Sequence, residues 1–299
     1  MNITQIIAQE LSATTAQITA AVELLDDGAT VPFIARYRKE ATGGLDDSQL
    51  RTLEERLGYL RELMARKETV LKSIEEQGKL TPELQAAIDA CDNKTALEDI
   101  YLPYKPKRRT KAQIARENGL QPLADLLLAE QNTDPEAAAQ DYLNEQVPDS
   151  KAALDGARAI LMEQFAEDAE LIGVLREKLW NEAEVHAQVI AGQENAGEKF
   201  ADYFDHREPV RAMPSHRALA VLRGRNENVL QVALKYQPDE TPVTEQSEYE
   251  KIIAAHFKID SNNKWLRDTV RLTWRAKIFL SLELDAFNRL KEAADTDAI

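Results

Sequence analysis

A regular stripe of apolar residues predicts one long helix between residues 46 and 78. Its members fall on alternating steps of three and four residues: Leu50, Leu53, Leu57, Leu60, Met64, Leu71 and Ile74. Only Lys67 interrupts the stripe. Asp46, with Gln49 three residues later, fits a capping box, and Gly78 fits a helix end. The stripe resembles a coiled-coil seam, and such a stripe usually packs on a neighbouring helix of the same chain.

Helical patterns separated by proline and glycine fill most of the remaining sequence. Thr81-Pro82 opens a helix to about Ala90, and Thr95 with Glu98 forms a capping box for a helix that ends before Pro103. Further helices are expected from Thr110 to Gly119, from Pro122, from Thr133, from Ser150 to Phe165, over 168–191, over 244–257 and over 262–294. The predicted fold class is therefore mainly α, with long packed helices.

One β-hairpin is predicted at about residues 216–236. Ala218, Ala220 and Leu222 alternate with their neighbours, and a second apolar run from Val229 to Leu234 follows the polar sequence GRNEN. The composition of the sequence changes near Asn195, where prolines and aromatic residues become frequent. We therefore expect a helical N-terminal domain over 1–195, and a hairpin with a long helix over 196–299.

Composition places the chain among folded, water-soluble proteins. Of its 299 residues, 43% are apolar and 30% are charged, and the formal net charge is −15. A chain this acidic is repelled by nucleic acid at long range, so contact with a polyanion has to come from clustered cations. The single Cys91 excludes an intramolecular disulfide and a Cys-rich zinc site. The first residues do not resemble a signal peptide, and no run approaches the roughly 18 apolar residues of a membrane span, so we expect a cytoplasmic protein.

The first cluster of cations lies in FIARYRKEATGGLDD, where Arg36, Arg38 and Lys39 are close together. Cations are favoured in the last turn of a short helix that opens at Pro32, and Arg36 could pair with Glu40 one turn later. Alternatively, they belong to a short basic helix of a helix–turn–helix unit that contacts phosphates or an acidic protein surface.

The second cluster is KPKRRTK, which contributes Lys105, Lys107, Arg108, Arg109 and Lys111. Two prolines are expected to hold its entry extended and to display these cations. Tyr101 and Tyr104 flank the cluster and could stack on bases or pack beneath the loop. The alternative is a solvated loop that forms ion pairs with the acidic body of the protein.

No catalytic motif is present. Asp202, Asp205, His206 and His216 could ligate a metal, but sets of carboxylates and histidines arise by chance in acidic chains. An enzyme that uses Asp202, Asp205 and His206 on phosphodiesters is the corresponding alternative. Phosphate-loop, dinucleotide-binding and nucleophile-elbow sequences do not occur. We predict no catalytic residue, no cofactor and no metal, and thus a protein that is not an enzyme.

Three segments resemble one known family. TVPFIARYRKEATGGLD, LEDIYLPYKPKRRTKA and SHRALAVLRGRNENVL are similar to the bacterial Tex proteins, which are transcription accessory proteins, and the resemblance extends over essentially the whole chain. It implies a mainly helical N-terminal region with a helix–turn–helix element. An RNase H-like domain, helix–hairpin–helix elements and a C-terminal OB-type RNA-binding domain would then follow. A chain of 299 residues would end before the RNase H-like domain.

The expected function is a non-catalytic N-terminal scaffold of a transcription accessory factor that binds nucleic acid, RNA chiefly through domains absent here. Its contacts with RNA or DNA would come from the eight cations of the two clusters: Arg36, Arg38, Lys39, Lys105, Lys107, Arg108, Arg109 and Lys111. The alternative is a protein-interaction scaffold, whose leucine stripe and acidic faces dock RNA polymerase or associated factors without touching nucleic acid.

Overall fold

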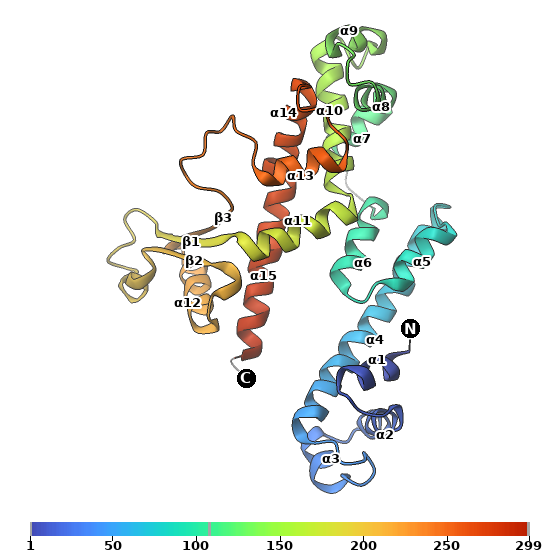
Figure 1. Ribbon diagram of the computed structural model, residues 1–299, viewed down its shortest axis with the longest axis vertical. Helices are drawn as coiled ribbons and strands as arrows, with labels where there is room; N and C mark the ends of the chain where they lie inside the picture. The colour runs from blue at the N-terminus through green and yellow to red at the C-terminus, as the bar shows by residue number, and fades with distance from the viewer. Residues whose placement is uncertain (1, 107–108, 298–299) are drawn as a thin grey trace. The chain divides into compact units, whose positions relative to one another are not determined.

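The computed structural model describes residues 2–106 and 109–297 and has two compact units, Met1–Lys105 and Pro106–Ile299 (Figure 1). Helices dominate the described residues, and three strands form a single small sheet, so the mainly α prediction is confirmed. Residue 195, the domain boundary expected from the sequence, lies inside the second unit, in the turn after the first strand. As a functional division it stays a prediction.

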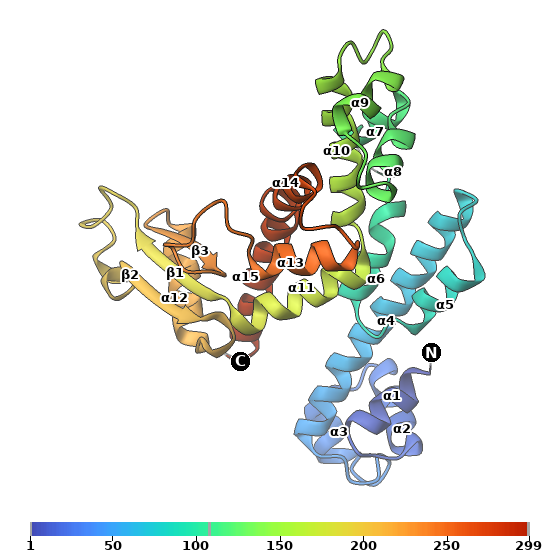
Figure 2. The ribbon, with the colours of Figure 1, turned by 45° about the horizontal axis from the view of Figure 1, so that its top comes forward.

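The first unit is built along one long helix, α4. Its elements are α1 (Ile3–Glu10), α2 (Thr15–Asp26), α3 (Val31–Tyr37), α4 (Asp47–Glu76), α5 (Pro82–Ala90), α6 (Lys94–Tyr101) and the 3₁₀ turn η1 (Leu102–Tyr104). Helices α1, α2 and α3 pack against the first part of α4, and α5 and α6 pack against its later part (Figure 2). All five helices bury apolar residues in one core with α4.

The long helix begins as the sequence predicts. Asp46 Oδ1 accepts a hydrogen bond from the Gln49 amide at 2.7 Å, and the Gln49 side chain accepts one from the Asp46 amide at 3.1 Å. The stripe, however, runs through Lys67, which is only 5% exposed and donates from Nζ to the Asp89 carbonyl oxygen at 2.8 Å. Beyond Leu60 the buried positions are Leu63, Lys67, Val70 and Ile74, whereas the predicted Met64 and Leu71 are half-buried. Because the stripe lies in the core, it cannot be the docking face that the scaffold alternative required.

The second unit holds the remaining helices. They are α7 (Lys111–Glu117), α8 (Gln121–Ala129), α9 (Pro135–Ala139), α10 (Ser150–Ala166), α11 (Ala169–Glu182), α12 (Ser215–Asn226), α13 (Glu248–His256), α14 (Lys264–Thr273) and α15 (Phe279–Asp297), with the 3₁₀ turns η2 (Gln140–Tyr142), η3 (Glu198–Tyr203) and η4 (Val210–Ala212). A π-helical turn, η5 (Trp274–Ile278), joins α14 to α15, so the predicted helix over 262–294 is one rod with a wide turn in it. Trp274 in this turn is fully buried and stacks on Tyr249, with ring centroids 4.5 Å apart.

The β structure differs from the prediction. Strand β1 (Glu184–Val189) is the centre of an antiparallel sheet, with β2 (Asp205–Pro209) on one side and β3 (Leu230–Lys235) on the other. The predicted helix over 168–191 is therefore wrong after Glu182.

The predicted hairpin at 216–236 is also wrong in its first half, because residues 215–226 form helix α12 and only β3 is a strand. Ala218, Val221 and Leu222 are buried together, and their spacing of three and four residues marks one helix face. α12 packs against β3 and α15.

The sequence predicts the N-cap residue correctly for some helices and wrongly for others. Thr81 and Thr110 cap α5 and α7 as expected. Asn93, not Thr95, caps α6, and Asp149, not Ser150, caps α10. In both cases a short polar side chain one or two residues earlier accepts the hydrogen bond instead. Within the described part of the chain, the helices lack the combined length and apolarity needed to cross a membrane.

Candidate nucleic-acid interface

The first basic cluster lies where α3 ends and turns toward α4. Pro32 sits in the first turn of α3, and Val31 and Ile34 fix the helix to the core. The helix ends at Tyr37, with Arg36 in its last turn and Arg38 as the C-cap, positions that favour positive charge. Lys39 lies beyond the helix, so helix termination explains only part of the cluster.

The turn after α3 is held by its own hydrogen bonds. Thr42 is fully buried, and its hydroxyl donates to the carbonyl oxygens of Lys39 at 3.3 Å and of Arg38 at 3.4 Å. The Gly44 amide donates to the Lys39 carbonyl oxygen at 2.9 Å. Gly43 has φ of 62°, and its carbonyl oxygen accepts a hydrogen bond from Gln17 Nε2 of α2 at 3.0 Å. The cations are therefore carried by a turn with a defined backbone.

The cations of this turn lack carboxylate partners. Within residues 2–105, Arg36, Arg38 and Lys39 are exposed and form no ion pair, so the expected Arg36–Glu40 pair is not made. The other four arginines of that range are all paired: Arg51 with Asp47, Arg56 with Glu10, Arg61 with Asp26 and Arg66 with Glu98, at 2.6–2.8 Å. Hydrogen bonds from Arg61 and Arg66 lower the pKa values of Asp26 and Glu98. Unpaired arginine charge in this unit is therefore confined to the last turn of α3 and the turn that follows it.

Two aromatic side chains stand beside these cations. Phe33 is 42% exposed and Tyr37 is 62% exposed, and their ring centroids are 5.3 Å apart. The Arg38 guanidinium lies 5.7 Å from the centroid of the Phe33 ring. We call Phe33, Arg36, Tyr37, Arg38 and Lys39 the basic–aromatic surface.

A hollow of about 700 Å³ opens along this surface. It is lined by Arg36, Tyr37, Arg38, Lys39, Glu40, Ala41, Gly43 and Gly44. Sequence reasoning did not single out Phe33 and Tyr37, although the signal was present. Their spacing of four residues places them on one helix face, while the apolar Val31 and Ile34 occupy the face toward the core.

The second cluster is divided by the structure. Lys107 and Arg108 lie outside the described residues, Lys105 is exposed at the end of the first unit, and Arg109 and Lys111 belong to the second. Arg109 forms an ion pair with Glu117.

The structure decides between the expectations for the residues around this cluster. Leu102–Tyr104 is a 3₁₀ turn rather than an extended entry. Tyr101 is buried and its hydroxyl lies 2.9 Å from Ser73 Oγ, so it packs beneath the turn and cannot stack on a base. Arg116, which follows the cluster, points inward and pairs with the buried Glu163 at 2.7 Å.

Lys105 does not join the basic–aromatic surface. Gln77, at the C-terminal end of α4, donates from Nε2 to the Tyr104 carbonyl oxygen at 2.8 Å, which places Lys105 near that end. The basic–aromatic surface leads into the opposite end of α4, which is 30 residues long. At the rise of an α-helix these ends are about 45 Å apart.

The metal-site alternative gains no geometric support. His206 Nε2 lies 3.1 Å from Glu208 Oε2, and Arg217 also donates to Glu208. Burial acts to raise the pKa of Glu208, but these hydrogen bonds outweigh it and lower the pKa. Asp202 and His216 are exposed, and the described part of the chain contains no group of three His, Cys, Asp or Glu side chains that could hold a metal.

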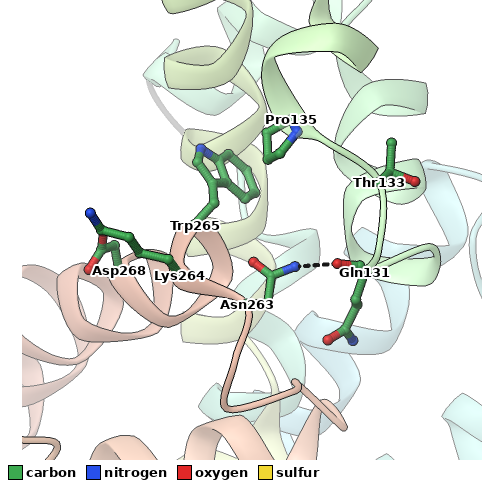
Figure 3. Close-up of a pocket in the computed structure, with 7 residues that line it drawn as sticks. All are labelled: Gln131, Thr133, Pro135, Asn263, Lys264, Trp265 and Asp268. Atoms are coloured by element: carbon green, nitrogen blue, oxygen red, sulfur yellow. Dashed lines mark hydrogen bonds between the residues drawn. The ribbon is translucent and has the colours of Figure 1, made fainter.

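A second hollow, of about 410 Å³, lies within the second unit (Figure 3). Its lining residues are Gln131, Thr133, Pro135, Asn263, Lys264, Trp265 and Asp268. Asn263 Nδ2 donates to the Gln131 carbonyl oxygen at 2.7 Å, which ties the start of α14 to the loop before α9. Lys264 and Asp268 balance one another in charge, so this hollow does not attract anions.

Comparison with known proteins identifies the family. The family model described as "Tex-like protein N-terminal domain" matches residues 1–75, and the model described as "Tex central region-like" matches residues 130–299. The chain belongs to the Tex family. The resemblance recognised from three sequence segments is thus confirmed.

Relatives of this Tex chain are considerably longer. It is 80% identical to Transcriptional accessory protein Tex of Neisseria gonorrhoeae over 299 residues, which are 100% of this chain and 40% of that protein. It is 52% identical to Protein tex of Bordetella pertussis over 303 residues, 98% of this chain and 38% of that protein. It is 30% identical to S1 RNA-binding domain-containing protein 1 of Homo sapiens over 222 residues, 71% of this chain and 22% of that protein. The chain therefore spans about 40% of the length of the bacterial relatives it matches.

The two predicted clusters fall differently on the matched regions. The basic–aromatic surface lies within the N-terminal match of this Tex chain, which ends at residue 75. The cations of KPKRRTK lie between the two matched regions, in the segment 76–129.

Proposed function

We propose that this Tex chain is a non-catalytic N-terminal part of a transcription accessory factor, and that it contacts nucleic acid through the basic–aromatic surface. The observation that carries the proposal is the unpaired charge of Arg36, Arg38 and Lys39 on a chain of net charge −15. An acidic body repels a polyanion, so a local group of free cations determines where a phosphate backbone can approach. Arginine suits this role because its planar guanidinium donates two parallel hydrogen bonds to a phosphate.

The family supports a nucleic-acid setting for this surface. One relative is named as a transcriptional accessory protein and another as containing an S1 RNA-binding domain. We propose that full-length Tex binds RNA chiefly outside these 299 residues, and that the basic–aromatic surface adds a weaker contact. Helices α2 and α3, joined by residues 27–30 and in contact with each other, are the candidates for the predicted helix–turn–helix element.

Binding of a fluorescent oligonucleotide, measured by anisotropy, tests the proposal. Arg36→Gln/Arg38→Gln removes two free cations from the surface. Lys72→Gln/Lys79→Gln removes the same charge from exposed positions at and just beyond the C-terminal end of α4, and serves as the matched control. Because a hydrogen bond to a charged group contributes about 1.5 kcal/mol or more, the first variant should lose at least about tenfold in affinity and the control far less. Equal losses of affinity in the two variants would show that binding depends only on the net charge of the chain, and would contradict the proposal.

The second candidate function is a protein-interaction scaffold for RNA polymerase or associated factors. The observation in its favour is apolar exposure on the C-terminal rod, where Leu272, Leu280 and Leu284 are 42–59% exposed. It predicts capture of transcription proteins that persists after nuclease treatment, together with no measurable oligonucleotide binding by the purified chain.

A further inference from the structure

The exposed aromatic rings of this chain are concentrated at one place. Among the described residues, Phe33 and Tyr37 are the Phe, Tyr and Trp side chains that are exposed. Both lie on α3, and Tyr37 lines the 700 Å³ hollow together with Arg36, Arg38 and Lys39. Exposed aromatic rings beside free cations are the combination that recognises bases and phosphates together.

The two rings have different surroundings. Phe33 has the Arg38 guanidinium 5.7 Å from its centroid and the Tyr37 ring 5.3 Å away at an interplanar angle of 45°. Within residues 2–105 no cation covers the Tyr37 ring, although three cations line the same hollow. Phe33 therefore supports the neighbouring ring, and Tyr37 presents a face to solvent.

We propose that Tyr37 is a base-stacking platform and that the hollow takes an unpaired nucleotide. The base would lie on the Tyr37 ring, and the adjoining phosphates would meet Arg36, Arg38 and Lys39. A base inside a duplex has both faces covered by its neighbours, so only a single strand can use the ring. This inference rests on the proposed function, because it assigns the kind of nucleic acid to the same surface.

The position of Tyr37 makes the ring removable without disturbing the core. It is the last residue of α3, and the core contacts of that helix come from Val31 and Ile34. Tyr37→Ala therefore removes the platform, and Tyr37→Phe keeps a ring at the same place. Neither substitution changes the charge of the surface.

The experiment compares three fluorescent probes on the whole 299-residue chain: an oligothymidine strand, an abasic strand of equal length, and a duplex. Alanine removal of a stacking ring weakens binding by about 5- to 150-fold per base. Tyr37→Ala should lose affinity in this range for the oligothymidine strand and keep its affinity for the abasic strand and the duplex. Tyr37→Phe should bind all three probes as the unaltered chain does.

Failure of this inference is distinguishable from failure of the proposed function. If Tyr37→Ala binds oligothymidine unchanged, or loses affinity equally for the abasic strand, the platform is refuted while the effect of Arg36→Gln/Arg38→Gln still stands. If an acidic peptide displaces the oligothymidine and depends on Tyr37 to the same extent, the surface is not selective for bases and the inference also fails. If no probe binds in a salt-dependent manner, both proposals fall.

Discussion

Replacing Gly224 with alanine should destabilise the second unit, although helix propensity alone predicts the reverse. Gly224 lies in α12 and is buried against β3. A Cβ atom added there would lie 2.5 Å from Leu230 Cδ1 and 2.8 Å from Leu230 Cγ. Leu230 is 1% exposed and is paired with Val189 in the sheet, so it has little room to move.

Two contributions of opposite sign decide how Gly224→Ala changes the free energy of unfolding. Exchanging glycine for alanine inside a helix stabilises a protein by about 0.5–1 kcal/mol. Forcing an extra carbon into a filled core costs about 1–3 kcal/mol. Gly173, in α11 of the same unit, provides the control because a Cβ there meets nothing within 4 Å. Gly173→Ala should therefore stabilise, and Gly224→Ala should be about 1–3 kcal/mol less stable than Gly173→Ala.

Urea unfolding followed by tryptophan fluorescence measures the difference. All three tryptophans, Trp180, Trp265 and Trp274, lie in the second unit, so the signal reports on that unit alone. Equal shifts for the two variants would refute the packing of α12 on β3. If the clash is located correctly, adding Leu230→Ala to Gly224→Ala should cost less than the sum of the single changes.

Two further predictions concern the α4 stripe and a carboxyl group. Leu63→Ala should lower the free energy of unfolding by about 2–5 kcal/mol, because Leu63 is fully buried. Met64→Ala, at a half-buried position, should lower it by well under half of that amount. Thermal unfolding followed by circular dichroism measures both. Hydrogen bonds from Arg207 and Lys235 lower the pKa of Asp239 from 3.8 to about 2. The stability that this carboxylate contributes is therefore present above pH 3.8 and is lost as the pH falls through about 2. Carboxyl titration by NMR should show this low pKa, and Arg207→Gln should raise it.

Features fixed by neighbouring residues could be read from the sequence. The start of α4 depends on Asp46 and Gln49, which are three residues apart, and each side chain accepts a hydrogen bond from the other's backbone amide. The sheet could not be read in this way, because β1 is a strand through its pairing with β2 and β3, which lie further along the chain. The segment around Ala218 and Leu222 satisfies both a two-residue and a 3.6-residue period, and packing against β3 and α15 selects the helix.

The candidate site was predictable only in part for a similar reason. The sequence places Arg36, Arg38 and Lys39 together, but it does not tell which arginines of an acidic chain find carboxylates. Arg56 and Arg61 do so through Glu10 and Asp26, which are 46 and 35 residues away. Local sequence therefore finds the cations, and the fold determines which of them remain free.

The salt dependence of binding to a single-stranded oligonucleotide tests the central claim most directly. Each phosphate neutralised on a single strand contributes about 0.7 to the slope of log K against log salt concentration. Arg36→Gln/Arg38→Gln should therefore flatten the slope by about 1.4, whereas Lys72→Gln/Lys79→Gln should leave it as it is in the unaltered chain. Identical slopes for the three proteins would show that Arg36 and Arg38 do not contact phosphates.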